Sequence, residues 1–199
     1  MKAMPSESVD LVIDDGPYLV NYKSRFGNTH YPNDNPNNAN WLHPCYSEIY
    51  RILKNNSFFI CFYGYYQTDK FIQAWRKAGF GLQGHLVWVK EHHSKSKYVK
   101  FFHDVAYLLV KGNPPFPDSP LPDVFIRKSE GNEFHPAQKP LNAVIPLINK
   151  FSKEGEIVFD PHTGSGSIPL AAKQLGRNFI GVELLKKHVD TAKKRLNVY

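Results

Sequence analysis

Apolar and polar residues recur with two periodicities along this chain, and these periodicities predict alternating strands and helices. Short β-branched or aromatic runs predict strands, and the first, Val9–Ile13, ends where Gly16 and Pro17 forbid continuation. The other predicted strands are Ser57–Tyr63, His85–Val89, Asp104–Val110, Glu156–Asp160 and Asn178–Val182. Apolar residues spaced three or four apart predict helices at Trp41–Lys54, Asp69–Ala78, Leu141–Phe151 and Ser167–Leu175, and in a last segment through Leu185, Val189, Ala192 and Leu196. Such alternation indicates an α/β fold with a largely parallel sheet.

Three stretches lack both periodicities, and we expect them to be irregular. Residues 19–40 are rich in Asn, which is typical of a solvated loop. This loop is either a plain connector or a segment that orders on a ligand. Residues 91–100 are basic, and residues 111–134 are rich in proline. No repeat or second-domain boundary interrupts the pattern, so we predict one domain over residues 1–199.

The composition indicates what kind of partner the protein binds and in which cellular compartment it works. Lys and Arg number 25 against 18 Asp and Glu, a net charge of +7 that favours a polyanionic partner. The longest apolar run, Phe58–Tyr63, is far shorter than the roughly 20 residues of a membrane span, and the first residues do not resemble a signal peptide. Two cysteines, Cys45 and Cys61, indicate a reducing compartment. We therefore expect a cytoplasmic location.

The segment from Phe159 to Ser167 joins a predicted strand to a predicted helix, a place where α/β proteins bind ligands. Gly164 and Gly166 would allow a ligand to approach the backbone, and Glu183 ends the next strand, where an acidic residue typically binds ribose hydroxyls. A Gly-x-Gly alone could also be a plain turn. The third glycine of a dinucleotide site and the lysine of a P-loop are both missing, which favours S-adenosylmethionine.

Asp15, Gly16, Pro17 and Tyr18 follow the first predicted strand. The exocyclic amine of a nucleobase is a poor nucleophile, because its lone pair is delocalised into the ring. Asp15 and the Gly16 carbonyl could accept its hydrogens, and Tyr18 could stack on the base. Taken alone, the segment could equally be a turn with an exposed ring.

Together, and in this order, the segments resemble DNA methyltransferases that modify adenine N6 or cytosine N4, in the group whose catalytic motif precedes the cofactor motif. The matching segments are 8–18, 50–60, 85–90, 103–107, 135–140, 159–166 and 176–183. The resemblance implies a doubly wound, mainly parallel sheet of the S-adenosylmethionine-dependent methyltransferase type, with one antiparallel strand. It also implies circular permutation, and the late start of the chain means that one edge strand could be missing.

The resemblance also implies the site residues. Asp15, Gly16, Pro17 and Tyr18 would be catalytic. The residues expected to bind the donor are His135, Lys139, Asp160, His162, Gly164, Ser165, Gly166 and Glu183. Gly16 replaces the proline of the family, and His162 replaces its phenylalanine. Because proline would stiffen the turn, we expect a proline at position 16 to leave activity equal or higher.

The implied partner is double-stranded DNA, from which the target base is extruded. Lys90, Lys95, Lys97 and Lys100 could contact phosphates or belong to a solvated turn. We expect no metal site, and enzymes of this group often form homodimers. Asp at position 15 favours adenine over cytosine. The alternatives are a cytosine-N4 enzyme, a non-catalytic DNA-binding relative, suggested by Gly16 and His162, and an enzyme acting on RNA or protein.

Overall fold

A seven-stranded sheet runs through the computed structural model, which describes residues 1–22, 31–94, 98–126, 134 and 138–198. The strands are β1 (Val9–Asp14), β2 (Leu53–Phe62), β3 (Gly81–Ser94), β4 (Phe101–Lys111), β5 (Val124–Ile126), β6 (Ile157–Asp160) and β7 (Asn178–Gly181). Their order across the sheet is β5-β3-β4-β2-β1-β6-β7. Only β4 runs antiparallel to its described neighbours, β2 and β3, while all other described pairs are parallel. The predicted sheet with one antiparallel strand is confirmed.

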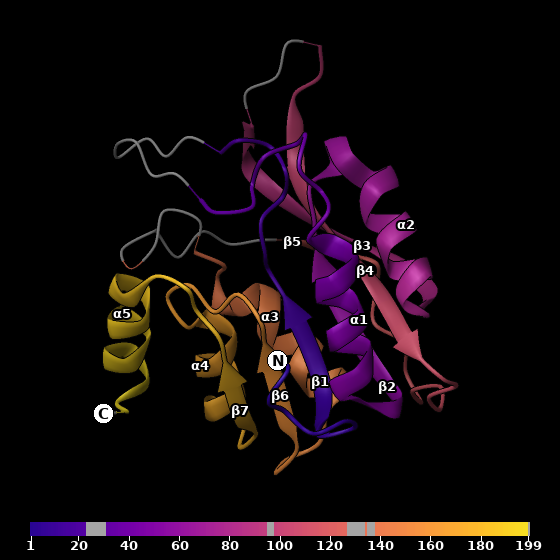
Figure 1. Cartoon of the computed structure of the whole chain (residues 1–199), viewed down its shortest axis with the longest axis vertical. Helices are drawn as coiled ribbons and strands as arrows, with labels where there is room; N and C mark the ends of the chain where they lie inside the picture. Colours follow the sequence, from indigo (N-terminus) through magenta and orange to yellow (C-terminus); the bar gives the residue numbers. More distant parts are fainter. Residues whose placement is uncertain (23–30, 95–97, 127–133, 135–137, 199) are drawn as a thin grey trace.

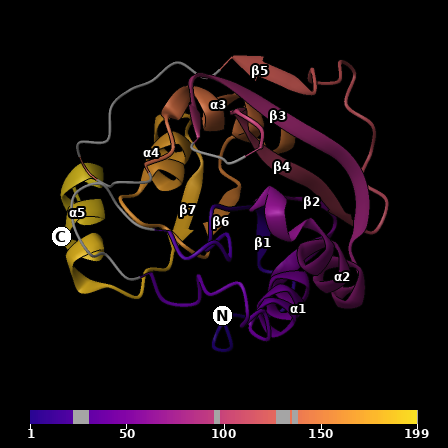
Figure 2. The same cartoon turned by 90° about the horizontal axis from the view of Figure 1, so that it is seen from above.

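Helices cover both faces of the sheet (Figures 1 and 2). They are α1 (Leu42–Ile52), α2 (Thr68–Ala78), α3 (Leu141–Phe151), α4 (Ser167–Gln174) and α5 (Lys186–Leu196), with one 3-10 turn, η1 (Tyr65–Gln67). Figure 2 shows α1 and α2 on one face and α3 and α4 on the other, with α5 beside α4. None of the helices in the described part of the chain is long and apolar enough to span a membrane.

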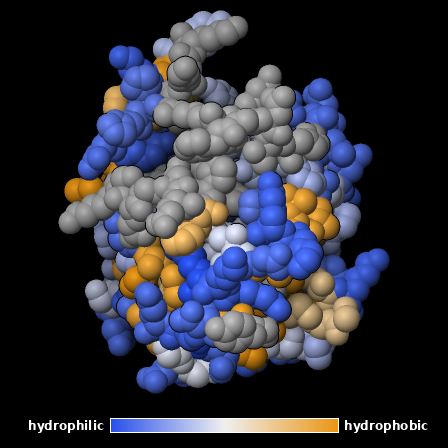
Figure 3. Space-filling model, turned by 90° about the vertical axis from the view of Figure 1, so that its left-hand side faces the viewer, coloured by the Kyte–Doolittle hydropathy of each residue, from blue (hydrophilic) through white to orange (hydrophobic). Residues whose placement is uncertain are grey.

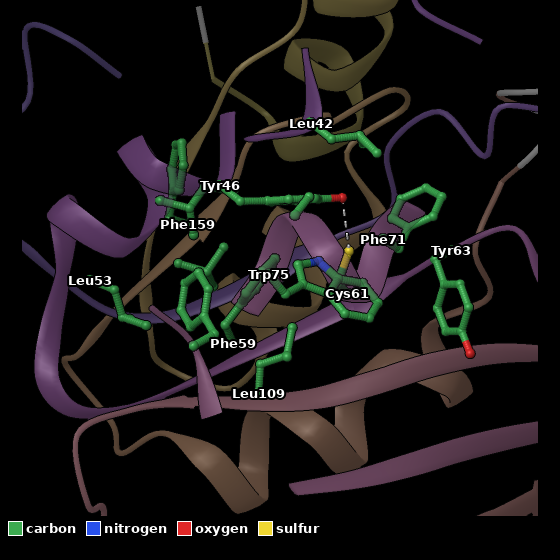
Figure 4. Close-up of a cluster of buried hydrophobic side chains, with 14 of the residues drawn as sticks. Leu42, Tyr46, Leu53, Phe59, Cys61, Tyr63, Phe71, Trp75, Leu109 and Phe159 are labelled. Atoms are coloured by element: carbon green, nitrogen blue, oxygen red, sulfur yellow. Dashed lines mark hydrogen bonds between the residues drawn. The ribbon is translucent and has the colours of Figure 1, made fainter. Parts of the chain in front are cut away.

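The alternation of side chains along β1 divides the core into two layers. Val12 lies in the cluster formed with α1 and α2, whereas Leu11 and Ile13 lie in the cluster formed with α3 and α4. Figure 4 shows the first cluster, in which the Tyr46 hydroxyl lies 3.4 Å from the sulfur of Cys61. This polar contact lies within the apolar layer, next to Asp14 at the end of β1, with which Cys61 is in register.

The structure corrects three predicted boundaries. Residues 111–134 are not wholly irregular, because β5 pairs with β3 and its Phe125 stacks on Trp88 at 5.0 Å. In residues 91–100, β3 continues to Ser94. The helix predicted to reach Lys54 ends at Ile52, because Leu53 pairs with Val9 of β1 as the first residue of β2. In each case strand pairing, which is not visible locally in the sequence, decides the outcome.

Candidate active site

The candidate catalytic and cofactor segments meet because of the strand order. β1 lies between β2 and β6, and the three strands are parallel, so the segments that follow them share one edge of the sheet. Asp14 is in register with Cys61 of β2, and Asp160 at the end of β6 is in register with Gly181 of β7. Residues 15–18 therefore lie between the end of β2 and the turn after β6.

Asp15, Tyr18 and Lys139 form a hydrogen-bonded group at this edge. The Tyr18 hydroxyl donates to Asp15 Oδ1 at 2.7 Å, and Lys139 Nζ lies 3.0 Å from both the Tyr18 oxygen and Asp15 Oδ1. The ammonium also lies 4.2 Å from the centre of the Phe62 ring. Burial raises the pKa of Tyr18 well above its ordinary value, and the charge of Asp15 raises it further. The hydroxyl therefore stays protonated and serves as a donor.

Backbone groups build the turn after β6. Asp160 is 1% exposed and accepts a hydrogen bond from the amide of His162 at 3.1 Å. Burial raises the pKa of Asp160 well above its ordinary value. Gly164 and Gly166 adopt φ angles of +52° and +83°, a conformation that favours glycine. Glu183 accepts hydrogen bonds from the amides of Gly164 at 2.9 Å and Leu185 at 2.8 Å, so its carboxylate is fixed beside the turn.

Helix α5 holds the other side of this turn. Arg195 donates to the carbonyl of Ser165 and to the hydroxyl of Ser167, both at 3.1 Å, and its guanidinium lies 4.7 Å from the Phe134 ring centre. No sequence motif marked Arg195 for this role. The lysines at 186, 187, 193 and 194 of the same helix are exposed. Hydrophilic and hydrophobic residues are mixed on the side of the molecule that carries α5 (Figure 3).

These residues fit the adenosyl group of a methyl donor. Asp160 is a buried carboxylate at the strand end, the glycine turn leaves the backbone open to close approach, and Glu183 is positioned to accept hydroxyl hydrogens. Lys139, expected among the donor residues, contacts Asp15 and Tyr18. The expected donor residue His135 lies outside the described residues.

His162 makes a contact that sequence reasoning missed. Its Nδ1 lies 2.7 Å from Oδ1 of Asp14, which is 1% exposed, and its ring meets Trp41 edge-on at 5.8 Å. A Cβ at Gly16 would lie 2.6 Å from this Nδ1, well inside contact distance. Proline carries that Cβ, so proline at position 16 requires the imidazole or the backbone to shift, a cost that the expectation of equal or higher activity did not include. Burial is the largest single effect and lowers the pKa of His162, but the charge and hydrogen bond of Asp14 and the charges of Asp160 and Glu183 together outweigh it, so the net shift is upward.

The loop at residues 19–40 and the candidate DNA-contacting lysines make different contacts with the rest of the protein. In the loop at residues 19–40, the carboxylate of Asp34 accepts amide hydrogen bonds from Val20 at 3.1 Å and Tyr22 at 2.6 Å. These hydrogen bonds join Asp34 to the backbone that enters the loop. Among the candidate DNA-contacting lysines, Lys90 forms an ion pair with Asp104 at 2.9 Å and Lys100 is exposed. Lys95 and Lys97 lie outside the described residues.

The potential metal ligands and the two thiols can be located in the part of the chain that the structure describes. No group of three or more His, Cys, Asp or Glu side chains there is arranged to hold a metal ion. Burial raises the pKa of both thiols, Cys45 and Cys61, which keeps them protonated. Cys61 contacts Oδ2 of Asp14 at 3.7 Å, so it supports the carboxylate that binds His162.

The parallel strands, the glycine turn and the acidic residues after β6 and β7 define an α/β protein of the nucleoside-binding methyltransferase type. The chain belongs to the N6/N4 family of DNA methylases, whose family model matches residues 9–122 and 118–194. The methyl donor of this family is S-adenosylmethionine.

Known relatives agree with this assignment. The "Putative methylase YubD" of Escherichia coli (strain K12) is 43% identical over 196 residues, which are 98% of this chain and 85% of that protein. A shorter match of 71 residues, 36% of this chain and 20% of the relative, is 42% identical to the type II methyltransferase M.HinfI of Haemophilus influenzae.

Solved structures share the fold. The M1.HpyAVI–SAM complex has a TM-score of 0.74 at 26% identity, covering 96% of this chain and 90% of that one. The cytosine-N4-specific PvuII DNA methyltransferase has a TM-score of 0.79 at 20% identity, covering 98% and 81%.

Proposed function

We propose that this protein transfers a methyl group from S-adenosylmethionine to the exocyclic amine of a base flipped out of double-stranded DNA, with adenine N6 as the favoured acceptor. One observation carries the proposal: Asp15 and Tyr18 follow β1 and lie beside the glycine turn that follows β6. An acceptor carboxylate and an aromatic ring suit the amine and the face of an extruded base, since an amine inside the duplex is out of reach.

Asp15 and the carbonyl of Gly16 would accept the two hydrogens of the amine. This localises the lone pair on nitrogen and makes it a better nucleophile. The Tyr18 ring would stack on the base, while its hydroxyl holds the Asp15 carboxylate in one rotamer. Lys139 adds a second donor to the same oxygen. When nitrogen gains the methyl group it must lose one proton, and the Asp15 carboxylate would accept it.

On the donor side, Asp160, Gly164, Ser165, Gly166 and Glu183 would bind the nucleoside portion. Glu183 would accept ribose hydroxyls with the lone pairs that its two amide partners leave. When bound, the donor supplies an electrophilic methyl group on sulfonium sulfur. The chain's contribution is positioning, and holding the reacting atoms about 3–3.5 Å apart accounts for much of such an acceleration.

The test is incubation with donor labelled in the methyl group and duplex DNA of mixed sequence, followed by digestion to nucleosides. We expect label in N6-methyladenine. Label in N4-methylcytosine alone would contradict the adenine assignment and retain the class of reaction. Absence of label, together with donor binding too weak for calorimetry at millimolar concentration, would contradict the proposal. Absence of both label and donor binding, with DNA binding retained, would favour a non-catalytic DNA-binding protein. Preferential labelling of single-stranded RNA would favour an enzyme that acts on RNA.

A further inference from the structure

Asp14, Gly16 and His162 form a contact that joins the two halves of the site. Asp14 is the last residue of β1, and His162 belongs to the turn after β6, 148 positions later. The carboxylate of Asp14 is held on both sides, by His162 Nδ1 at 2.7 Å on Oδ1 and by the Cys61 thiol at 3.7 Å on Oδ2. A buried carboxylate held in this way has little freedom to move.

The imidazole occupies the space that a side chain at position 16 would fill. A Cβ there would lie 2.6 Å from Nδ1 and 3.0 Å from Cε1 of His162, and 3.0 Å from Oδ1 of Asp14. Contacts this short require the imidazole, the carboxylate or the backbone to shift. Glycine at position 16 and histidine at position 162 are therefore structurally linked.

We propose that His162 is a positioning residue for methyl transfer, which ties the donor turn to Asp14 and thereby sets the distance from the donor to Asp15, and that Gly16 provides the space for it. This inference rests on the proposed function, because it takes residues 15–18 as the base site and residues 160–166 as the donor site. His162 acts through Asp14 and is not required to touch either substrate.

The linkage predicts how substitutions combine. His162→Ala removes the bond to Asp14 and should lower the single-turnover rate at saturating donor and DNA at least tenfold. Gly16→Ala adds the obstructing Cβ and should cause a similar loss. In the double variant the Cβ enters space that the imidazole has left, so its rate should lie within twofold of that of His162→Ala alone. Independent roles would instead multiply to a loss of a hundredfold or more, which would overturn the proposal.

A conservative variant separates positioning from folding. Nδ2 of asparagine can take the place of the imidazole Nδ1, so His162→Asn should recover the rate to within about threefold of the parent. Leucine branches at the same carbon as asparagine but has no hydrogen-bond donor, so the His162→Leu rate should remain at least tenfold below that of the parent. The comparison of these two variants tests the proposal even if His162→Ala does not fold. Equal rates for the asparagine and leucine variants, at equal thermal stability, would overturn the proposal.

Gly84→Ala is the matched glycine control, because nothing lies within 4 Å of a Cβ at that position, and it should keep the parental rate. The parent is measured first in every series. A parent that transfers no methyl group refutes the proposed function and this inference with it. An active parent with multiplicative losses refutes the inference alone.

Discussion

The two segments that meet at the carboxyl edge of the sheet are built in different ways. After β1, side chains bind one another, as Tyr18 and Lys139 do at the Asp15 carboxylate. After β6, the backbone does most of the binding, with left-handed glycines and an amide held by Glu183. The first arrangement suits a chemical step, which needs particular functional groups. The second suits recognition of a ligand through close approach, so substitutions should separate into effects on rate and effects on donor affinity.

Asp15→Ala should have the largest effect and should act on rate. It removes the acceptor of the amine hydrogen, and the Gly16 carbonyl alone cannot align the amine, so we expect kcat to fall by about three powers of ten. Donor and DNA dissociation constants, measured by calorimetry and filter binding, should change little. Asp190→Ala removes an exposed carboxylate on α5 and serves as the control. A parental rate in Asp15→Ala would exclude the catalytic role.

Glu183→Ala should show the opposite pattern. Two amides lose their acceptor and the ribose loses its expected partner, which should weaken donor binding about 10- to 100-fold, or roughly 1.4–3 kcal/mol. At saturating donor, kcat should stay within a fewfold of the parent. A calorimetric titration gives the donor affinity. Glu183→Gln keeps an acceptor oxygen, so its donor affinity should lie between those of the parent and Glu183→Ala. A change in kcat with unchanged affinity would remove the contrast between the two segments.

Tyr18 tests whether the β1 segment uses both its ring and its hydroxyl. Tyr18→Ala should cost about 1–3 kcal/mol of base stacking, measured as weaker binding of DNA with an abasic partner opposite the target. Tyr18→Phe keeps the ring but removes the donor to Asp15, and should lower kcat about fivefold, close to 1 kcal/mol. A parental kcat for Tyr18→Phe would mean that only the face of the ring matters.

The motif residues could be predicted from sequence because their chemistry is local. A carboxylate, a turn and an aromatic ring after one strand, and glycines after another, indicate their roles wherever the strands lie. The contacts of His162 and Arg195 could not be predicted, since their partners are 148 and 28–30 positions away and depend on the strand order. β5 was missed for the same reason: three residues in a proline-rich stretch become a strand through pairing with β3.

The smallest expected effect is a pH dependence of stability at the bond that joins the two segments. Burial alone would lower the pKa of His162, but the carboxylates of Asp14, Asp160 and Glu183 raise it, and the net shift is above the ordinary value of about 6.5. The folded state therefore holds this proton more tightly than the unfolded chain. Its contribution to stability is complete below about pH 6.5 and is lost as the pH rises through the raised pKa.

His162→Asn cannot titrate at this position, so it provides the reference. The melting temperature of the parent relative to this variant should fall as the pH rises from 6 to 9. The fall should be a few degrees at most, because 1 kcal/mol shifts the melting temperature of a domain of this size by about 2–4 °C. His92→Asn, which changes an exposed histidine, should follow the parent at every pH. A constant difference between parent and His162→Asn would show that the proton on His162 does not contribute to holding the two segments together.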